Sequence, residues 1–167
     1  MIHEIGSGMV HMGLKKSNET LVGIYASANV HYALLLYASW PFSFVPVGIY
    51  DSLGIDAVRY ITKHANLKII FADNMQRVKN LIEYRESTST LETIVSLLEP
   101  SFSLIEQAKS KGIQLITYDE LIKMGRNNPT EPQPPQPTDT ALILYTSGTT
   151  GDPKGNIIIS FFIIQAN

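Results

Sequence analysis

Short apolar runs alternate with amphipathic stretches along most of this chain. The runs are rich in β-branched residues and too short for helices, which is typical of buried strands. Between them, apolar residues recur every three or four positions, as in helices that cover a sheet. The runs predict strands at residues 20–26, 44–49, 67–72, 91–97, 113–116 and 141–144.

Helices are predicted between these strands, and local signals mark several of their ends. The expected helices span residues 4–13, 31–39, 55–65, 75–82, 103–110 and 117–125. Ser103 and Glu106 have the spacing of a capping box, in which each side chain accepts a hydrogen bond from the other residue's backbone. Thr117 and Glu120 repeat this spacing. Gly125 is expected to close the last helix, because glycine is the usual residue after a helix end.

Strands and helices alternate about every 20–25 residues, which predicts an α/β fold. Right-handed β-α-β units would give a parallel sheet with flanking helices on both faces. The length of 167 residues fits one domain. Residues 126–139 hold five of the nine prolines and are expected to form an extended linker or surface loop. Docking of this segment on an SH3-type domain stays open, although a spacer needs no partner.

Charge and composition narrow the classes of partner. The formal net charge is −2, so no nucleic acid is expected as a partner. The chain has no cysteine, which excludes disulfides and thiolate metal sites. The four histidines have no metal-ligand spacing, so no metal site is expected among them. No apolar run reaches the ~20 residues of a membrane helix, and the first residues lack the pattern of a secretory signal.

The most distinctive stretch is YTSGTTGDPKG, residues 145–155, directly after the last apolar run. Its glycines lack a Cβ, so backbone N–H groups can approach an anion closely. Four hydroxyl side chains follow Tyr145, and Lys154 adds a positive charge. The stretch therefore predicts a phosphate-binding loop. It is not a Walker A loop, because Lys154 precedes Gly155 rather than serine or threonine.

Two other interpretations of this stretch have less support than a phosphate-binding loop. A flexible linker would need only the composition of the stretch, whereas here eleven positions follow an ordered pattern. A hydrolase nucleophile would need a GxSxG turn, and Ser147 lies in the string SGT instead.

The order of residues 145–155 matches the pattern aromatic-TSG-Ser/Thr-TG-x-PKG at every position. The chain therefore resembles the adenylate-forming enzymes, which include acyl-CoA synthetases, luciferases and peptide-synthetase adenylation domains. Upstream, VPVGIYDSLG at 45–54 is similar to a segment of the long-chain acyl-CoA synthetases. The resemblance implies that residues 1–155 form a partial AMP-binding N-terminal domain with the acyl-CoA synthetase/luciferase-like fold.

The resemblance implies a long-chain fatty acid–CoA ligase. In that reaction a fatty acid and ATP give an acyl-adenylate and pyrophosphate, and the acyl group then passes to coenzyme A. Mg²⁺ accompanies the ATP phosphates. The implied phosphate-binding residues are Thr146, Ser147, Gly148, Thr149, Thr150, Gly151, Lys154 and Gly155. The family's catalytic lysine has no counterpart in these residues, so no catalytic residue is expected in this chain.

Residues 156–167 depart from the family pattern. They contain seven isoleucines or phenylalanines and no histidine, so they are expected to be an apolar tail foreign to the family. The chain is accordingly interpreted as a truncated ligase that is inactive by itself. The alternative is a non-catalytic truncated paralogue or gene-model product that at most binds phosphate or a protein partner. Only the resemblance implies an intracellular, membrane-associated location, such as the endoplasmic reticulum or peroxisome.

Overall fold

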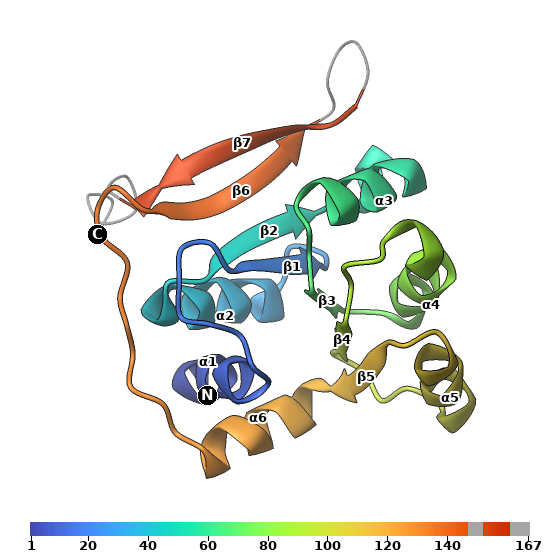
Figure 1. Cartoon of the computed structure of the whole chain (residues 1–167), viewed down its shortest axis with the longest axis horizontal. Coiled ribbons are helices and arrows are strands. Elements are labelled where there is room, and N and C mark those ends of the chain that lie inside the picture. Colours follow the sequence, from blue (N-terminus) through green and yellow to red (C-terminus); the bar gives the residue numbers. More distant parts are fainter. Residues whose placement is uncertain (147–151, 161–167) are drawn as a thin grey trace.

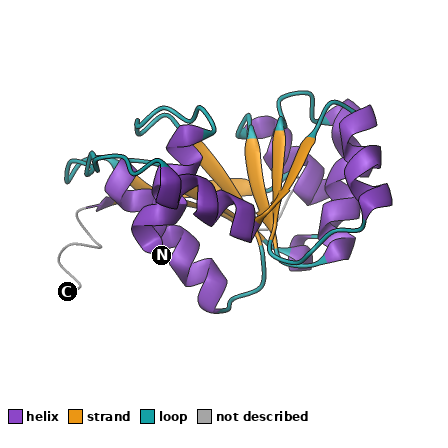
Figure 2. Cartoon of the chain, turned by 90° about the horizontal axis from the view of Figure 1, so that it is seen from below, coloured by secondary structure: helices purple, strands orange, loops and turns teal. Residues whose placement is uncertain are grey.

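The computed structural model describes residues 1–146 and 152–160 of the chain. Its centre is a seven-stranded sheet with the strand order β5-β4-β3-β1-β2-β6-β7, and helices cover both faces (Figures 1 and 2). The strands are β1 (Leu21–Tyr25), β2 (Val45–Ile49), β3 (Ile69–Ala72), β4 (Thr93–Ser96), β5 (Gln114–Thr117), β6 (Thr140–Thr146) and β7 (Lys154–Ile159). The predicted α/β fold is confirmed.

The first six strands run parallel to one another, and β7 runs antiparallel to β6. The sheet is therefore mostly parallel, so the predicted parallel sheet is confirmed, and β7 adds an antiparallel strand next to β6. The reason lies in the length of the connection. Only residues 147–153 separate β6 from β7, whereas a parallel crossover needs about a dozen residues or more.

Six α-helices are present in the described residues. They are α1 (Ile2–His11), α2 (Val30–Ser39), α3 (Ile55–His64), α4 (Met75–Glu83), α5 (Phe102–Ser110) and α6 (Tyr118–Asn127). Short 3₁₀ turns occupy Trp40–Phe42, Asp51–Leu53 and Tyr84–Ser87.

The helices form two apolar cores, one on each face of the sheet. Side chains from α3, α4 and α5 pack on one face, and those from α1, α2 and α6 pack on the other. In β3, Ile70 belongs to the first core while Ile69 and Phe71 belong to the second. This alternation follows from the two-residue repeat of a strand, and it explains why the strands read as continuous apolar runs.

One predicted capping box is confirmed and the other is wrong. In α6 the Thr117 side chain accepts from the Glu120 N–H, and the Glu120 carboxylate accepts from the Thr117 N–H. In α5 the capping residue is Ser101 rather than Ser103, because the Ser101 hydroxyl accepts from the Leu104 N–H at 3.3 Å. Ser101 supplies the same backbone cap two residues earlier, and Ser103 lies inside the first turn.

The replacement Thr117→Ala is expected to lower the free energy of unfolding by about 1 kcal/mol, because the Glu120 N–H would lose its side-chain partner. Urea unfolding would measure the change. Ser110→Ala, near the end of α5, is the control, since the Ser110 hydroxyl donates to the Gln107 carbonyl without capping a helix start. Equal effects of the two replacements would contradict a capping role.

The prediction that Gly125 closes α6 is also wrong, because the helix continues to Asn127. Gly125 instead lies against Glu4 and Gly8 of α1, the helix that Figure 1 shows beside α6. A Cβ built on Gly125 would stand 1.7 Å from the Glu4 carbonyl oxygen. Arg126 and Glu4 form an ion pair between the same two helices, with a 2.9 Å contact. Glycine is thus required by the close approach of two helices rather than by a turn.

The proline-rich segment crosses the surface between α6 and β6, after Arg126 and Asn127 have completed the helix. Hydrogen bonds hold its backbone to the body of the protein. The Thr130 N–H donates to the Ser7 hydroxyl at 3.0 Å. The Gln133 N–H donates to the Pro41 carbonyl at 2.8 Å, and the Gln133 carbonyl accepts from the Ser43 hydroxyl at 2.6 Å. The segment is therefore an attached surface strap.

Candidate phosphate-binding site

The β6–β7 hairpin carries the predicted phosphate loop. β6 pairs with β2 at Val47↔Ile143 and Gly48↔Leu144, and beyond these pairs the hairpin extends past the sheet and above α3 (Figure 1). The connection between β6 and β7 follows the carboxyl end of a parallel strand. Open α/β sheets bind their ligands at this edge.

The hairpin brings the two ends of the predicted loop together. Thr146 is the last residue of β6 and Lys154 is the first residue of β7, and the two are direct partners across the ladder. Gly155 is the partner of Tyr145. Thr146, Lys154 and Gly155 are all exposed. The other predicted ligands, Ser147, Gly148, Thr149, Thr150 and Gly151, lie outside the described residues.

Polar groups at the base of the loop are held by the strand after it. The Asn156 side-chain amide donates to the Thr146 hydroxyl oxygen at 3.1 Å and to the Leu144 carbonyl at 3.4 Å. As an acceptor in this bond, the Thr146 hydroxyl keeps its own hydrogen for another acceptor. Thr146 and Lys154 thus offer a hydroxyl donor and an ammonium group to an anion at the exposed start and end of the loop.

Tyr145 fixes the hairpin beside α3. Its hydroxyl shares a 2.7 Å hydrogen bond with Nδ1 of His64, the last residue of α3. Burial, and to a smaller extent neighbouring Tyr60, raises the pKa of Tyr145, so the phenol keeps its proton at neutral pH. A Cβ on Gly155 would stand 3.3 Å from the Tyr145 ring, so the missing side chain leaves the ring room against β7.

His64 is the residue that sequence reasoning missed. The sequence showed only that its spacing to the other histidines does not suit a metal, and the structure places it, exposed, at the end of α3. Its bond to Tyr145 joins residues 81 positions apart. No local pattern could reveal the pairing, because it depends on how α3 packs beside the hairpin.

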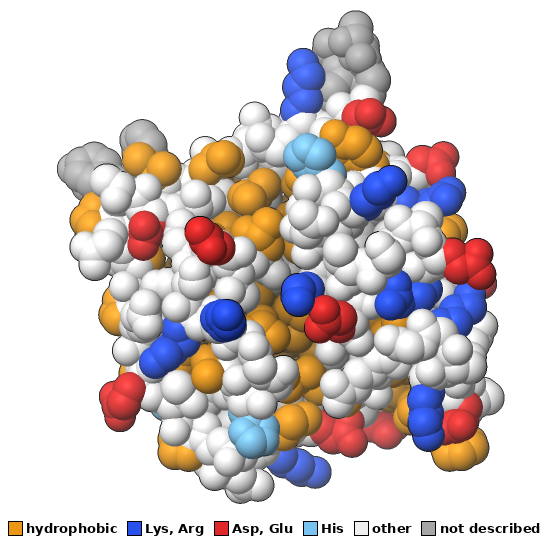
Figure 3. Space-filling model, in the orientation of Figure 1, with side chains coloured by type: hydrophobic (Ala, Val, Ile, Leu, Met, Phe, Trp, Pro, Cys, Tyr) orange, Lys and Arg blue, Asp and Glu red, His pale blue; other side chains and the backbone are white. Residues whose placement is uncertain are grey.

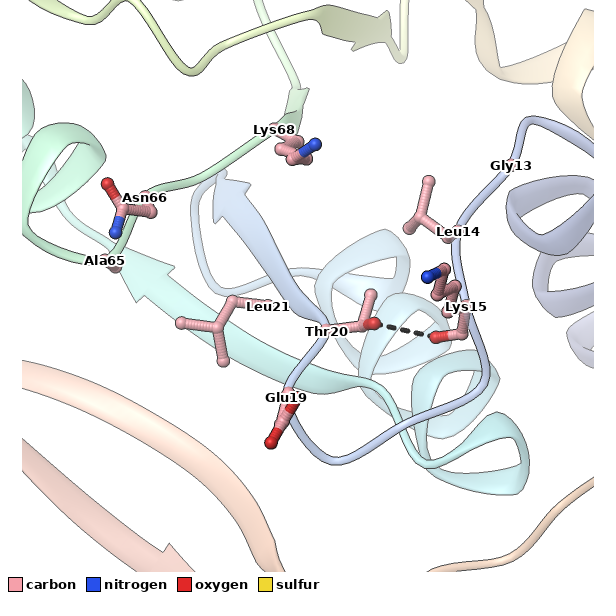
Figure 4. Close-up of a pocket in the computed structure, with 9 residues that line it drawn as sticks. All are labelled: Gly13, Leu14, Lys15, Glu19, Thr20, Leu21, Ala65, Asn66 and Lys68. Carbon is pink, nitrogen blue, oxygen red and sulfur yellow. Dashed lines mark hydrogen bonds between the residues drawn. The ribbon is translucent and has the colours of Figure 1, made fainter.

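A cavity of about 510 Å³ opens at the amino ends of the strands, opposite the ends that lead to the predicted phosphate loop. Figure 4 shows it between the segment before β1 and the turn that leads from α3 to β3. Lys15, Glu19 and Lys68 line it, and Lys68 also forms an ion pair with Glu92 at 3.1 Å. The cavity lies at the amino ends of β1 and β3, so it is separate from the predicted phosphate loop.

The surface around the site carries both signs of charge. Lysine and arginine side chains alternate with aspartate and glutamate over the face in Figure 3, without a large area of one sign. Within residues 1–146 and 152–160 no three histidine, aspartate or glutamate residues form a group suited to a metal ion. Nor does that part of the chain contain a helix long and apolar enough to span a bilayer.

Comparison with known families shows which family this chain belongs to. The family model described as AMP-binding enzyme matches residues 1–164. The chain belongs to the AMP-binding enzyme family, and the resemblance read from residues 145–155 is confirmed.

Within this family, the chain is similar to proteins named as long-chain acyl-CoA ligases or synthetases. The chain is 38% identical over 156 residues to long-chain-fatty-acid–CoA ligase 1 of Cavia porcellus, covering 92% of this chain and 22% of the relative. It is 36% identical over 156 residues to the peroxisomal long chain acyl-CoA synthetase 6 of Arabidopsis thaliana, with the same coverage of 92% and 22%. The chain thus spans about a fifth of the length of these relatives.

Solved structures share the fold. The adenylation domain of a carboxylate reductase from Mycobacterium chelonae superimposes with a TM-score of 0.85 at 17% identity, over 97% of this chain and 27% of that one. A long-chain-fatty-acid–CoA ligase from Archaeoglobus fulgidus gives a TM-score of 0.72 at 24% identity, over 96% and 28%. These structures establish the acyl-CoA synthetase/luciferase-like fold.

Proposed function

We propose that this chain supplies the ATP-phosphate-binding part of a long-chain fatty acid–CoA ligase. The observation that carries the proposal is the direct pairing of Thr146 with Lys154 at the mouth of the hairpin. This pairing brings the two ends of the predicted phosphate loop together at the carboxyl end of β6. Similarity to relatives named as long-chain ligases supports the fatty acid as the carboxylate substrate.

The loop would act on the first step of the reaction. A carboxylate oxygen of the fatty acid attacks the α-phosphorus of ATP, and the bond from that phosphorus to the bridging oxygen breaks. Pyrophosphate leaves with the electron pair. In the second step the thiol sulfur of coenzyme A bonds to the acyl carbon, and the bond from that carbon to AMP breaks as AMP leaves. The hydroxyls and N–H groups of the loop would hold the β- and γ-phosphates, while Lys154 offsets the charge that develops on pyrophosphate.

Mg²⁺ fits this site as an ion that arrives with the nucleotide. The described residues hold no carboxylate or histidine cluster for it, and Mg²⁺ binds readily to substrate phosphates with few protein ligands. Bound there, it would neutralise phosphate charge. The Thr146 hydroxyl and Lys154 ammonium would orient the phosphates from the protein side.

The expected affinity for Mg·ATP is about millimolar or weaker. Even a well-formed hydrogen bond to a charged group contributes only about 1.5–3 kcal/mol, and an exposed ion pair without such a bond contributes about 0–1 kcal/mol. Thr146 and Lys154 are both exposed, and the loop and ligand must also be ordered on binding. A dissociation constant in the micromolar range would contradict this expectation.

Nuclear magnetic resonance on the 167-residue chain tests phosphate binding directly. Titration with Mg·ATP should shift the backbone amide signals of residues 145, 146, 154 and 155. Mg·AMP, which lacks the β- and γ-phosphates, is the matched control and should shift them far less. Equal shifts with both nucleotides would overturn the assignment of this hairpin to the triphosphate.

A chimera tests the ligase reaction. The 156 matched residues of the Cavia porcellus ligase would be replaced by those of this chain, and acyl-CoA formation from palmitate, ATP and coenzyme A would be measured. We expect activity that Lys154→Ala abolishes. A folded chimera without activity would contradict the proposed function.

The location of the protein is a separate proposal. One relative is named as peroxisomal, and on this similarity we propose that the protein acts in the peroxisome. A fluorescent fusion distributed evenly through the cell would contradict it.

A further inference from the structure

The two halves of the hairpin are attached to the body of the protein in different ways. The half near residue 140 is held by several groups. The Trp40 indole N–H donates to the Ala141 carbonyl at 2.8 Å, and the Asn18 amide donates to the Thr140 carbonyl at 2.8 Å. The ladder to β2 adds pairs up to Leu144. The half that bears the loop begins where this ladder ends.

In the loop-bearing half, Tyr145 meets His64. Besides the 2.7 Å hydrogen bond, the two rings pack edge to face with centroids 5.9 Å apart. Tyr60, one turn earlier in α3, stacks on His64 with centroids 5.2 Å apart and planes 15° apart. Tyr145 is only 5% exposed although the adjacent Thr146 is exposed. Tyr60 and Tyr145 therefore restrict the orientation of the His64 ring.

In the described part of the chain, the Tyr145–His64 bond is the one side-chain hydrogen bond that links residues 145–146 and 152–156 to a helix. The other side-chain hydrogen bonds of these residues run between β6 and β7. The base of the phosphate loop is thus connected to α3 at Tyr145, one residue before Thr146.

We propose that His64 is a positioning residue for the phosphate loop. Its bond to Tyr145 holds the hairpin mouth at one angle to the sheet, so that Thr146 and Lys154 are placed before the triphosphate arrives. Ordering these residues in advance lowers the entropic cost of binding. The inference rests on the proposed function, because positioning affects affinity only where the loop binds phosphates.

The variant His64→Phe tests the bond while keeping an aromatic ring against Tyr60 and Tyr145. We expect the dissociation constant for Mg·ATP to rise about three- to tenfold, the usual effect of one lost hydrogen bond. His64→Asn places a hydrogen-bonding group near the position of Nδ1 and should recover part of the affinity. His31→Phe is the matched control, since His31 also packs edge to face on a tyrosine, Tyr118, but in the opposite core.

The salt dependence of Mg·ATP binding distinguishes a residue that positions the loop from one that contributes a positive charge. Lys154→Ala removes a cation, so it should reduce the loss of affinity with rising salt as well as the affinity itself. His64→Phe should weaken binding and leave the salt dependence at the wild-type value. A reduced salt dependence in His64→Phe would show that His64 acts as a cation and would overturn the positioning role.

The ligand-free protein gives a second measurement. Hydrogen exchange at the amides of residues 145, 146, 154 and 155 should be faster in His64→Phe than in the wild type, and unchanged in His31→Phe. Tyr145→Phe removes the other partner of the bond, so the double variant with His64→Phe should show little further effect. Fully additive effects would overturn the inference.

The two proposals fail in different ways. If wild-type protein shows no loop shifts with Mg·ATP, the proposed function and the positioning role both fall. If wild-type protein binds Mg·ATP and His64→Phe binds it equally well, only the positioning role falls.

Discussion

Replacing Gly125 with alanine is expected to lower the free energy of unfolding by about 3 kcal/mol or more. The new methyl carbon would stand 1.7 Å from the Glu4 carbonyl oxygen and 2.6 Å from the Gly8 nitrogen. Both are backbone atoms, so no side-chain rotation can relieve the contact. The α1 and α6 helices must separate, and that separation would disturb the core formed by α1, α2 and α6.

Whether Gly125→Ala lowers or raises stability distinguishes the steric contact with α1 from the effect of helix propensity. Helix propensity alone makes alanine more stable than glycine by about 1 kcal/mol in a helix interior. Thermal unfolding should instead show a midpoint about 6–12 °C lower for a chain of this size. Lys123→Ala in the same helix is the control, because Lys123 is exposed. A raised midpoint for Gly125→Ala would show that the two helices do not cross this closely.

The replacement Lys154→Ala is expected to weaken Mg·ATP binding by about tenfold or more. Lys154 is exposed at the first residue of β7, opposite Thr146, where its ammonium group can donate to phosphate oxygens. A charge-assisted hydrogen bond of this kind contributes about 1.5–3 kcal/mol. From a millimolar starting value, the dissociation constant should therefore exceed about 10 mM.

Loss of net charge alone must be separated from loss of this contact. Lys123→Ala again serves, because it removes one positive charge from α6, on the far side of the molecule from the hairpin (Figure 1). It should leave Mg·ATP binding within about twofold of the wild type, since exposed charges separated by more than about 10 Å are screened. If both lysine variants weaken binding equally, Lys154 has no specific contact with phosphate.

Local pattern determined much of the fold. Continuous apolar runs such as Ile69–Ala72 predicted strands buried on both faces, and the rhythm of strands and helices predicted their parallel pairing. Thr117 and Glu120 carried enough local chemistry to mark a helix start. The errors at Ser103 and Gly125 arose where two local solutions were equally good, or where a distant backbone set the requirement.

The candidate site shows the same division. The order of residues 145–155 predicted a phosphate-binding loop, because phosphate binding depends on a contiguous set of N–H groups, hydroxyls and a cation. The antiparallel return of β7 follows from chain geometry once the strand itself is recognised. The hydrogen bond between His64 and Tyr145 had no local signature.

By itself, then, the sequence determined the α/β class and the family, and it predicted the residues that would face ATP, because these properties reside in short-range order along the chain. The tertiary structure decided which residues support them. His64 lies beside Tyr145, and Gly125 lies against Glu4, only because helices distant in sequence pack side by side. Contacts of that kind depend on the relative placement of whole elements, which no window of neighbouring residues specifies.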